Sequence, residues 1–118
     1  MIKMTIALTR LEDLTPQEFQ DYWRNQHGEL VRGLAETLGI QRYVQAHSIA
    51  SEDLKNGQYY RPPYDGLAEV WYLSYDDFLT RLTSVAGKEA AKQLRKDEQR
   101  FAQIDLSRTW WSEEHEIL

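Results

Sequence analysis

His27 is the residue of this sequence whose type and position best fit a chemical role. It lies one helical turn after Trp23, at the border of an apolar stripe with Tyr22 beside it. An imidazole that titrates near neutral pH can take a proton from an activated carbon and return it to an oxygen, which suits enolisation, aldol cyclisation or dehydration. The alternative is a histidine near a helix end that hydrogen-bonds free carbonyl groups. We take His27 as the first candidate catalytic residue.

His47 is the second candidate, because it ends a row of polar side chains on a predicted strand. Tyr43, Gln45 and His47 alternate along the chain and therefore share one face of that strand. Three hydrogen-bonding side chains on one face are unusual for a pure core and suit the polar side of a pocket. The alternatives are a solvent-exposed row or a contact between two copies of the chain.

Glu69 is a carboxylate in the middle of another predicted strand, with apolar neighbours on its own face. Such a group needs a raised pKa or a cationic partner. It could orient a histidine, or form a structural ion pair with Arg42 or Arg108. Two histidines and one carboxylate are also the ligands of one class of iron site, but the spacing does not require such a site, so no metal is expected.

Composition excludes several classes of protein. The 118-residue chain has no cysteine, a formal net charge of −5 and no apolar run of membrane-spanning length. Between Lys88 and Arg100, basic residues alternate with Glu89, Asp97 and Glu98, as on an ordinary solvated helix face. No nucleic-acid partner, no membrane insertion and no nucleotide or other cofactor is expected. The first six residues do not resemble a signal peptide, so a cytoplasmic location is expected.

The helix that carries His27 has a clear start. Thr15 can cap the first turn, Pro16 suits the first helical position, and Glu18 completes a capping box. Gly28 is expected to interrupt this helix, so that a second short helix or turn covers 28–37. Gly39 is expected to end that second segment.

Hydrophobic periodicity predicts the remaining elements. Alternating residues predict strands at 2–9, 40–49, 67–74 and 105–112. Residues with helical spacing predict helices at 16–27, from Ser74 through Leu82, and at 87–101. The order of these elements is βαββαβ, which is the ferredoxin-like arrangement of a single α+β domain over residues 1–118. This fold has a four-stranded antiparallel sheet with helices on one face, and the uncovered face favours a homodimer.

A long polar loop at 50–64 runs into the third predicted strand and ends in Tyr64, Asp65 and Gly66. Loops of this length in a small domain are often functional. We expect the loop to cover one cleft shared by His27 and His47. The side chains expected to line this cleft and to bind substrate are Tyr22, Trp23, Tyr43, Tyr64, Asp65, Glu69 and Trp71.

Several motifs together resemble the EthD domain family. They are Thr15-Pro16-x-Glu18-Phe19-x-x-Tyr22-Trp23-x-x-x-His27-x-x-Leu30-Val31, Arg42-Tyr43-Val44-Gln45-x-His47, Tyr64-Asp65-Gly66-x-Ala68-Glu69-x-Trp71, Asp97-Glu98-x-x-Phe101 and Ser112-Glu113-Glu114-His115. The resemblance implies a dimeric α+β barrel, made by two sheets packed face to face, with a cleft between sheet and helices in each subunit. Relatives include a component associated with fuel-ether degradation and dehydratase, decarboxylase and cyclase-like enzymes of polyketide pathways. Similar barrels include lactone isomerases and cofactor-independent monooxygenases, so the resemblance implies architecture more firmly than reaction.

These observations leave three functions open. The preferred one is a cofactor-free enzyme of secondary or catabolic metabolism that transfers protons on a small hydrophobic carbonyl, aromatic or polyketide-like compound, as a cyclase, dehydratase or isomerase. The second is a cofactor-independent oxygenase of an oxidative degradation pathway. The third is a non-catalytic accessory protein that binds a hydrophobic metabolite.

Overall fold

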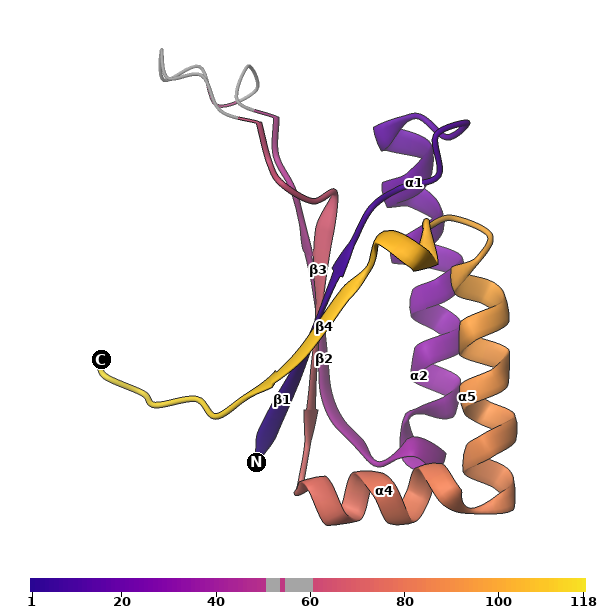
Figure 1. The fold of residues 1–118 in the computed structure, drawn as a ribbon, viewed down its shortest axis with the longest axis vertical. Coiled ribbons are helices and arrows are strands. Elements are labelled where there is room, and N and C mark those ends of the chain that lie inside the picture. The colour runs from indigo at the N-terminus through magenta and orange to yellow at the C-terminus, as the bar shows by residue number, and fades with distance from the viewer. Residues whose placement is uncertain (51–53, 55–60) are drawn as a thin grey trace.

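A computed structural model describes residues 1–50, 54 and 61–118 of the chain. Four strands form one sheet in the order β2-β3-β1-β4, and every neighbouring pair is antiparallel. The strands are β1 (Ile2–Leu8), β2 (Ile40–His47), β3 (Gly66–Tyr72) and β4 (Arg108–Ser112). This is the sheet of the predicted ferredoxin-like βαββαβ fold (Figure 1).

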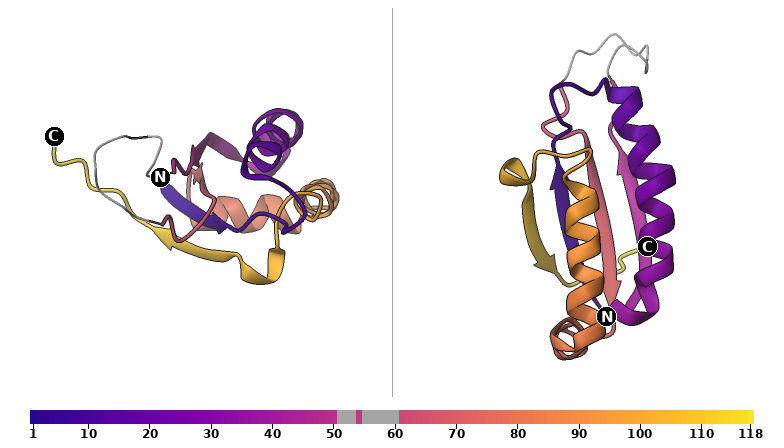
Figure 2. Two further views of the ribbon diagram at one scale, coloured as in Figure 1. Left: turned by 90° about the horizontal axis from the view of Figure 1, so that it is seen from above. Right: turned by 90° about the vertical axis from the view of Figure 1, so that its right-hand side faces the viewer.

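The long helices cover one face of the sheet, as predicted, and the C-terminal segment leaves on the other side (Figures 1 and 2). The elements of this layer are α1 (Pro16–Tyr22), the π-helical turn η1 (Trp23–His27), α2 (Gly28–Leu38), α4 (Tyr75–Thr83) and α5 (Val85–Glu98). Helix α2 packs against α5, and α4 lies across the end of the sheet. No helix in the described part of the chain is both long enough and apolar enough to span a bilayer.

The first helix begins as its capping residues predict. The Thr15 side chain accepts a hydrogen bond from the backbone of Glu18, and the Glu18 carboxylate accepts one from the backbone of Thr15. Gly39 adopts the left-handed conformation that ends α2, with φ of 76°. The prediction that Gly28 interrupts the helix is wrong. Gly28 has helical angles, φ −57° and ψ −42°, and donates its N–H to the carbonyl of Trp23, which is the hydrogen bond of a π turn.

The ends of other elements differ from prediction by a few residues. The last helix begins at Val85 because the Ser84 side chain caps it, and it ends at Glu98 rather than at 101. The last strand begins at Arg108 because the 3₁₀ turn η2 (Ile104–Leu106) precedes it. Most of the predicted loop at 50–64 lies outside the described residues.

The core lies between the sheet and the helices and is dominated by aromatic rings. Phe19, Trp23 and Phe101 are fully buried, and the ring of Phe19 packs 5.5 Å from that of Trp23 and 5.8 Å from that of Phe101. Gly66 opens β3 at the point where the Trp23 indole crosses it, and a Cβ at Gly66 would collide with that indole. Gly66 therefore allows Trp23 to lie directly on the strand.

Candidate active site

His27 sits in the π turn that joins α1 to α2, and its side chain points into the core, where the residue is only 4% exposed. Its Nδ1 lies 2.8 Å from Oδ2 of Asp97 on α5, and the Tyr22 hydroxyl donates to Oδ1 of the same carboxylate at 2.7 Å. The Phe101 ring packs 4.9 Å from the imidazole. A π turn inserts an extra residue into a helix and is common at functional sites. Here it places the imidazole between the two long helices.

The environment of His27 favours a neutral imidazole whose Nε2 is the basic nitrogen. Burial lowers the pKa of His27, and the hydrogen bond and charge of Asp97 oppose that shift only in part. Asp97 accepts the proton on Nδ1, so the lone pair of the neutral ring is on Nε2. The pair therefore has the arrangement of an oriented general base.

His27 lines an inner cavity of about 90 Å³ between the sheet and the helices. Most of its walls are apolar side chains from β1, β2 and β3, from α2 and from α5. They include Met4, Ile6, Leu8, Val31, Ile40, Ala68, Val70 and Leu94. The aromatic side chains Trp23, Tyr43 and Tyr72 complete the walls, and Glu98 is the carboxylate among them. Such a cavity suits an apolar ligand with one or two polar atoms.

Glu98 is unusual because an acidic side chain lies in this apolar setting. Burial raises the pKa of Glu98 to about 7; nearby Arg95 lowers it and nearby Asp97 raises it. In the described part of the chain, no hydrogen bond to its carboxyl accompanies these charges, and the side chain is half-buried. The cavity therefore contains a carboxylic acid that is substantially protonated at neutral pH.

The polar row on β2 forms a connected hydrogen-bond chain. His47 Nε2 lies 2.8 Å from the side-chain oxygen of Gln45, and the Gln45 amide donates to the Tyr43 hydroxyl at 3.0 Å and to the Trp23 carbonyl at 2.8 Å. The His47 ring stacks on the Trp23 indole with centroids 4.4 Å apart. Burial, and then the charge of Arg24, lowers the pKa of His47.

The two histidines lie on the same face of the sheet, and Trp23 lines the cavity of His27 and stacks on the ring of His47. His27 lines the inner cavity, whereas His47 lines a shallower polar hollow with Gln20, Arg24 and Gln45. The two imidazoles therefore open into different spaces rather than into the one shared cleft that the sequence predicts.

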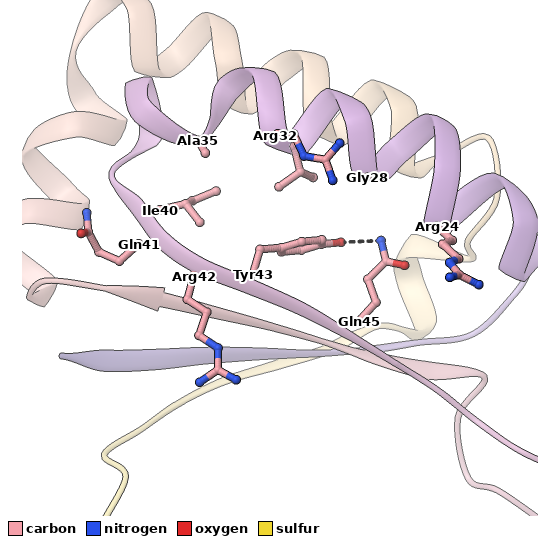
Figure 3. Close-up of a pocket in the computed structure, with 10 residues that line it drawn as sticks. Arg24, Gly28, Arg32, Ala35, Ile40, Gln41, Arg42, Tyr43 and Gln45 are labelled. Atoms are coloured by element: carbon pink, nitrogen blue, oxygen red, sulfur yellow. Dashed lines mark hydrogen bonds between the residues drawn. The ribbon is translucent and has the colours of Figure 1, made fainter.

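An outer groove of about 350 Å³ lies between α2 and β2 (Figure 3). Val31, Ile40 and Tyr43 line both this groove and the inner cavity, so these side chains form the boundary between the two. Arg24 and Gln45 lie at one end of the groove, while the Arg42 side chain points away from it (Figure 3). The groove and the inner cavity are therefore adjacent and separated by these three side chains.

Glu69 and Trp71 do not lie with His27, because their side chains are on the opposite face of the sheet. Glu69 forms an ion pair with Lys3 at 2.9 Å, rather than with either of the arginines named as its possible partners. The Trp71 ring packs under Lys3 and Arg42, and its N–H donates to Glu114. This face is the one that the helices leave uncovered.

Tyr64 and Asp65 lie at the end of the sheet near Arg10, not at the inner cavity. Asp65 accepts a hydrogen bond from the backbone of Arg10, and the Tyr64 carbonyl accepts one from the Ser48 hydroxyl. Both residues line a separate hollow with Pro16 and Gln20. Residues 51–53 and 55–60 of the predicted covering loop lie outside the described residues.

The sequence interpretation missed Asp97 and Glu98. Both were assigned to an ordinary solvated helix face, and that assignment is wrong, because Asp97 contacts His27 and Glu98 lines the cavity. Helical periodicity could have identified Glu98: Leu94, Glu98 and Phe101 are spaced i, i+4, i+7 and therefore lie on one face of a helix, with Glu98 between two apolar side chains. Among the described residues no cluster of three or more histidine, aspartate or glutamate side chains could hold a metal ion.

Comparison with known proteins gives one family. The model of the EthD domain matches residues 11–105, which is most of the chain. No curated protein matches it.

Solved structures share the fold at low sequence identity. An ethyl tert-butyl ether D (EthD) family protein from Bacillus halodurans is 20% identical with a TM-score of 0.63, covering 98% of this chain and 100% of that one. A dimeric protein with a ferredoxin-like fold from Bacteroides fragilis is 12% identical with a TM-score of 0.58, covering 95% and 94%. A variant of SnoaB, a cofactor-independent oxygenase from Streptomyces nogalater, is 14% identical with a TM-score of 0.55, covering 99% and 95%.

Proposed function

This chain belongs to the EthD domain family, and we propose that it is an enzyme that moves a proton on a small apolar carbonyl compound, with His27 as the base. The observation that carries the proposal is the 2.8 Å contact between His27 Nδ1 and Asp97 at the wall of an apolar cavity. A positioned imidazole with a carboxylate on its far nitrogen is suited to take a proton in a water-poor site.

The reaction begins with breakage of a C–H bond next to the carbonyl group. His27 Nε2 takes the proton, and the electron pair of the broken bond moves onto the carbonyl as an enolate. The imidazolium that forms is stabilised by Asp97, which accepts its Nδ1–H. Returning the proton at a different carbon gives isomerisation. If the enolate carbon instead attacks a second carbonyl group of the substrate, a C–C bond forms and the proton goes to the new alkoxide, which is cyclisation. If the enolate expels a β-hydroxyl group, the C–O bond breaks and the proton leaves with it as water, which is dehydration. In this proposal the reacting carbon lies in the inner cavity of about 90 Å³, beside His27.

A second candidate is a cofactor-independent oxygenase, favoured by the likeness to SnoaB. In that reaction the same carbanion reacts with dioxygen instead of being protonated again. The two candidates share the first step and differ in the fate of the electron pair. Oxygen uptake during turnover, followed with an oxygen electrode, separates them.

We also propose that the protein works as a homodimer through the uncovered face of its sheet. The Bacteroides fragilis protein of the same fold is dimeric. On this face Trp110, at the edge of the sheet, is 47% exposed, and Thr5 lies beside it in register. A second sheet packed there would remove the exposed Trp110 side chain from water.

The test of the catalytic proposal is α-proton exchange of small cyclic ketones, such as 2-indanone, in D₂O followed by ¹H NMR. The wild-type protein is expected to accelerate exchange over buffer. His27→Asn is expected to lower the protein-dependent rate by about a hundred- to ten-thousand-fold. The matched control is His115→Asn, the same substitution at an exposed histidine.

Two results would contradict the proposal. One is a wild-type protein that binds the ketones without accelerating exchange, which would indicate the metabolite-binding function instead. The other is a His27→Asn variant that exchanges at the rate of His115→Asn.

A further inference from the structure

We propose that Glu98 is a second catalytic residue, a general acid that gives its proton to the carbonyl oxygen of the substrate while His27 takes a proton from carbon. The inference rests on the proposed function and adds a second group to it. It also selects among reactions, because it favours proton transfer over reaction with dioxygen.

The first support is the placement of two adjacent carboxylates on α5. Successive helical residues point in directions about 100° apart. Asp97 is therefore turned toward Nδ1 of His27, and Glu98 is turned into the cavity that the same imidazole lines. One helical turn supplies both the group that orients the base and a proton-carrying group on the substrate side.

The second support is the lack of a structural partner for Glu98. Glu98 is half-buried, and removing a carboxylate even partly from water is costly unless an ion pair or hydrogen bonds compensate it. Within the described part of the chain, only the charges of Arg95 and Asp97 act on its carboxyl, with no hydrogen bond. A structural role would be served as well by an apolar side chain, because the neighbours in the cavity wall are Leu94, Tyr72 and Met4.

The third support is the set of titratable groups around Glu98. On its own helix these are Arg95 and Asp97; the groups that face it from other elements are His27 on η1, Tyr43 on β2 and Tyr72 on β3. The charge of Glu98 contributes to raising the pKa of Tyr43, so the two side chains interact electrostatically across the cavity. Burial brings the pKa of Glu98 itself to about 7, which is close to ideal for an acid that must release a proton near neutral pH.

The proposed step balances without an oxidant or reductant. A C–H bond breaks as an N–H bond forms at His27 Nε2, and the O–H bond of Glu98 breaks as an enol O–H bond forms. The products are the enol, an imidazolium and a carboxylate. In a dehydration, Glu98 protonates the leaving hydroxyl group instead, and water departs.

This role for Glu98 opposes the oxygenase alternative. Reaction with dioxygen needs the electron pair to remain on the carbanion, and protonation of the oxygen withdraws that pair into an enol. A protonated acid beside the developing enolate therefore directs the site toward isomerisation or elimination.

The experiment compares Glu98→Gln with Glu89→Gln, the same substitution at an exposed position of the same helix. The probe is again 2-indanone exchange in D₂O, measured from pH 5 to pH 9 with the buffer rate subtracted. The wild-type rate is expected to fall above about pH 7 as Glu98 loses its proton. Glu98→Gln is expected to be about a hundredfold slower and to lose this fall, whereas Glu89→Gln retains both rate and profile.

The outcomes separate this inference from the proposed function. If His27→Asn abolishes exchange while Glu98→Gln behaves as Glu89→Gln, the acid role of Glu98 is overturned and the base role of His27 stands. If His27→Asn has no effect, the proposed function itself fails. A ¹³C NMR titration of the side-chain carboxyl groups tests the inference without substrate. The Glu98 resonance is identified as the one that Glu98→Gln removes, and it is expected to titrate near pH 7 in the wild type. Titration near pH 4.5 would overturn the inference.

Discussion

The imidazole of His27 and the carboxylate of Asp97 meet at 2.8 Å although 70 positions separate them in the chain. The contact joins the π turn between α1 and α2 to the last turn of α5. Tyr22, one turn before the π turn ends, donates to the other oxygen of the same carboxylate. This network links the two long helices at the wall of the cavity and gives the imidazole one orientation.

Asp97→Asn is expected to lower the rate of ketone α-proton exchange by about a hundredfold, because the variant loses the charge that stabilises the His27 imidazolium. Tyr22→Phe is the control, since it removes a different hydrogen bond to the same carboxylate and leaves the His27 contact in place. Exchange rates of both variants are compared at pH 7. An Asp97→Asn rate equal to that of Tyr22→Phe would show that Asp97 does not support the base.

The stability of the protein is expected to fall as the pH rises from about 4.5 to about 7, through the contribution of Glu98. Burial raises the pKa of Glu98 to about 7 from its ordinary 4.5, so folding favours the protonated form. The stabilising contribution is complete below 4.5 and is lost as the pH rises through the raised value. The urea midpoint of the wild type should therefore decrease relative to that of Glu98→Gln over this interval.

The contribution of His27 to stability has the opposite pH dependence, because it is lost as the pH falls. Burial lowers its pKa below 6.5, so its contribution to stability is complete above 6.5 and is lost as the pH falls through the lowered value. The difference in urea midpoint between wild type and His27→Asn should therefore shrink as the pH falls below 6.5 and should stay constant above 6.5. A pH-independent difference for both variants would contradict the burial of the two groups in the folded state.

Gly66→Ala is expected to destabilise the protein by about 1–3 kcal/mol, because its methyl group would collide with the Trp23 indole. Gly33→Ala is the matched control: nothing lies within 4 Å of a Cβ there, and in the middle of α2 the change should stabilise by about 0.4–1 kcal/mol. Urea unfolding followed by tryptophan fluorescence measures both. Equal midpoints for the two variants would show that Trp23 does not lie on β3.

Trp110→Glu is expected to convert the proposed dimer to a monomer. Trp110 pairs with Thr5 in register and shares the uncovered sheet face with it, so a charge there would be buried in a face-to-face dimer. Leu79→Glu, at an exposed apolar position of α4, is expected to leave the dimer intact. Light scattering at micromolar concentration gives the mass of each variant. A wild-type monomer, or a Trp110→Glu dimer, would contradict the proposed interface.

Local patterns in the sequence were sufficient for the element order and the ends of several elements. The alternation of residues 2–9 predicts β1, and Thr15 and Glu18 predict the start of α1, because strand periodicity and capping depend on near neighbours. The same periodicity correctly grouped Tyr43, Gln45 and His47 on one face of β2, and the motifs spread from Thr15 to His115 indicated the EthD family. The roles of these side chains in a reaction remain predictions.

Only the tertiary structure decided which residues share a space. Alternation places Glu69 and Trp71 on one face of β3 but does not say that the helices cover the other face. Gly28 continues a helix because one π-type hydrogen bond and the packing of α2 outweigh its weak helix propensity of about 1 kcal/mol. The local sequence suggests that Asp97 and Glu98 are solvent-exposed charges, and only the packing of α5 against the π turn shows that they are not. Burial, and with it the pKa of Glu98 and the orientation of His27, comes from contacts between segments 70 positions apart, and no local pattern determines such contacts.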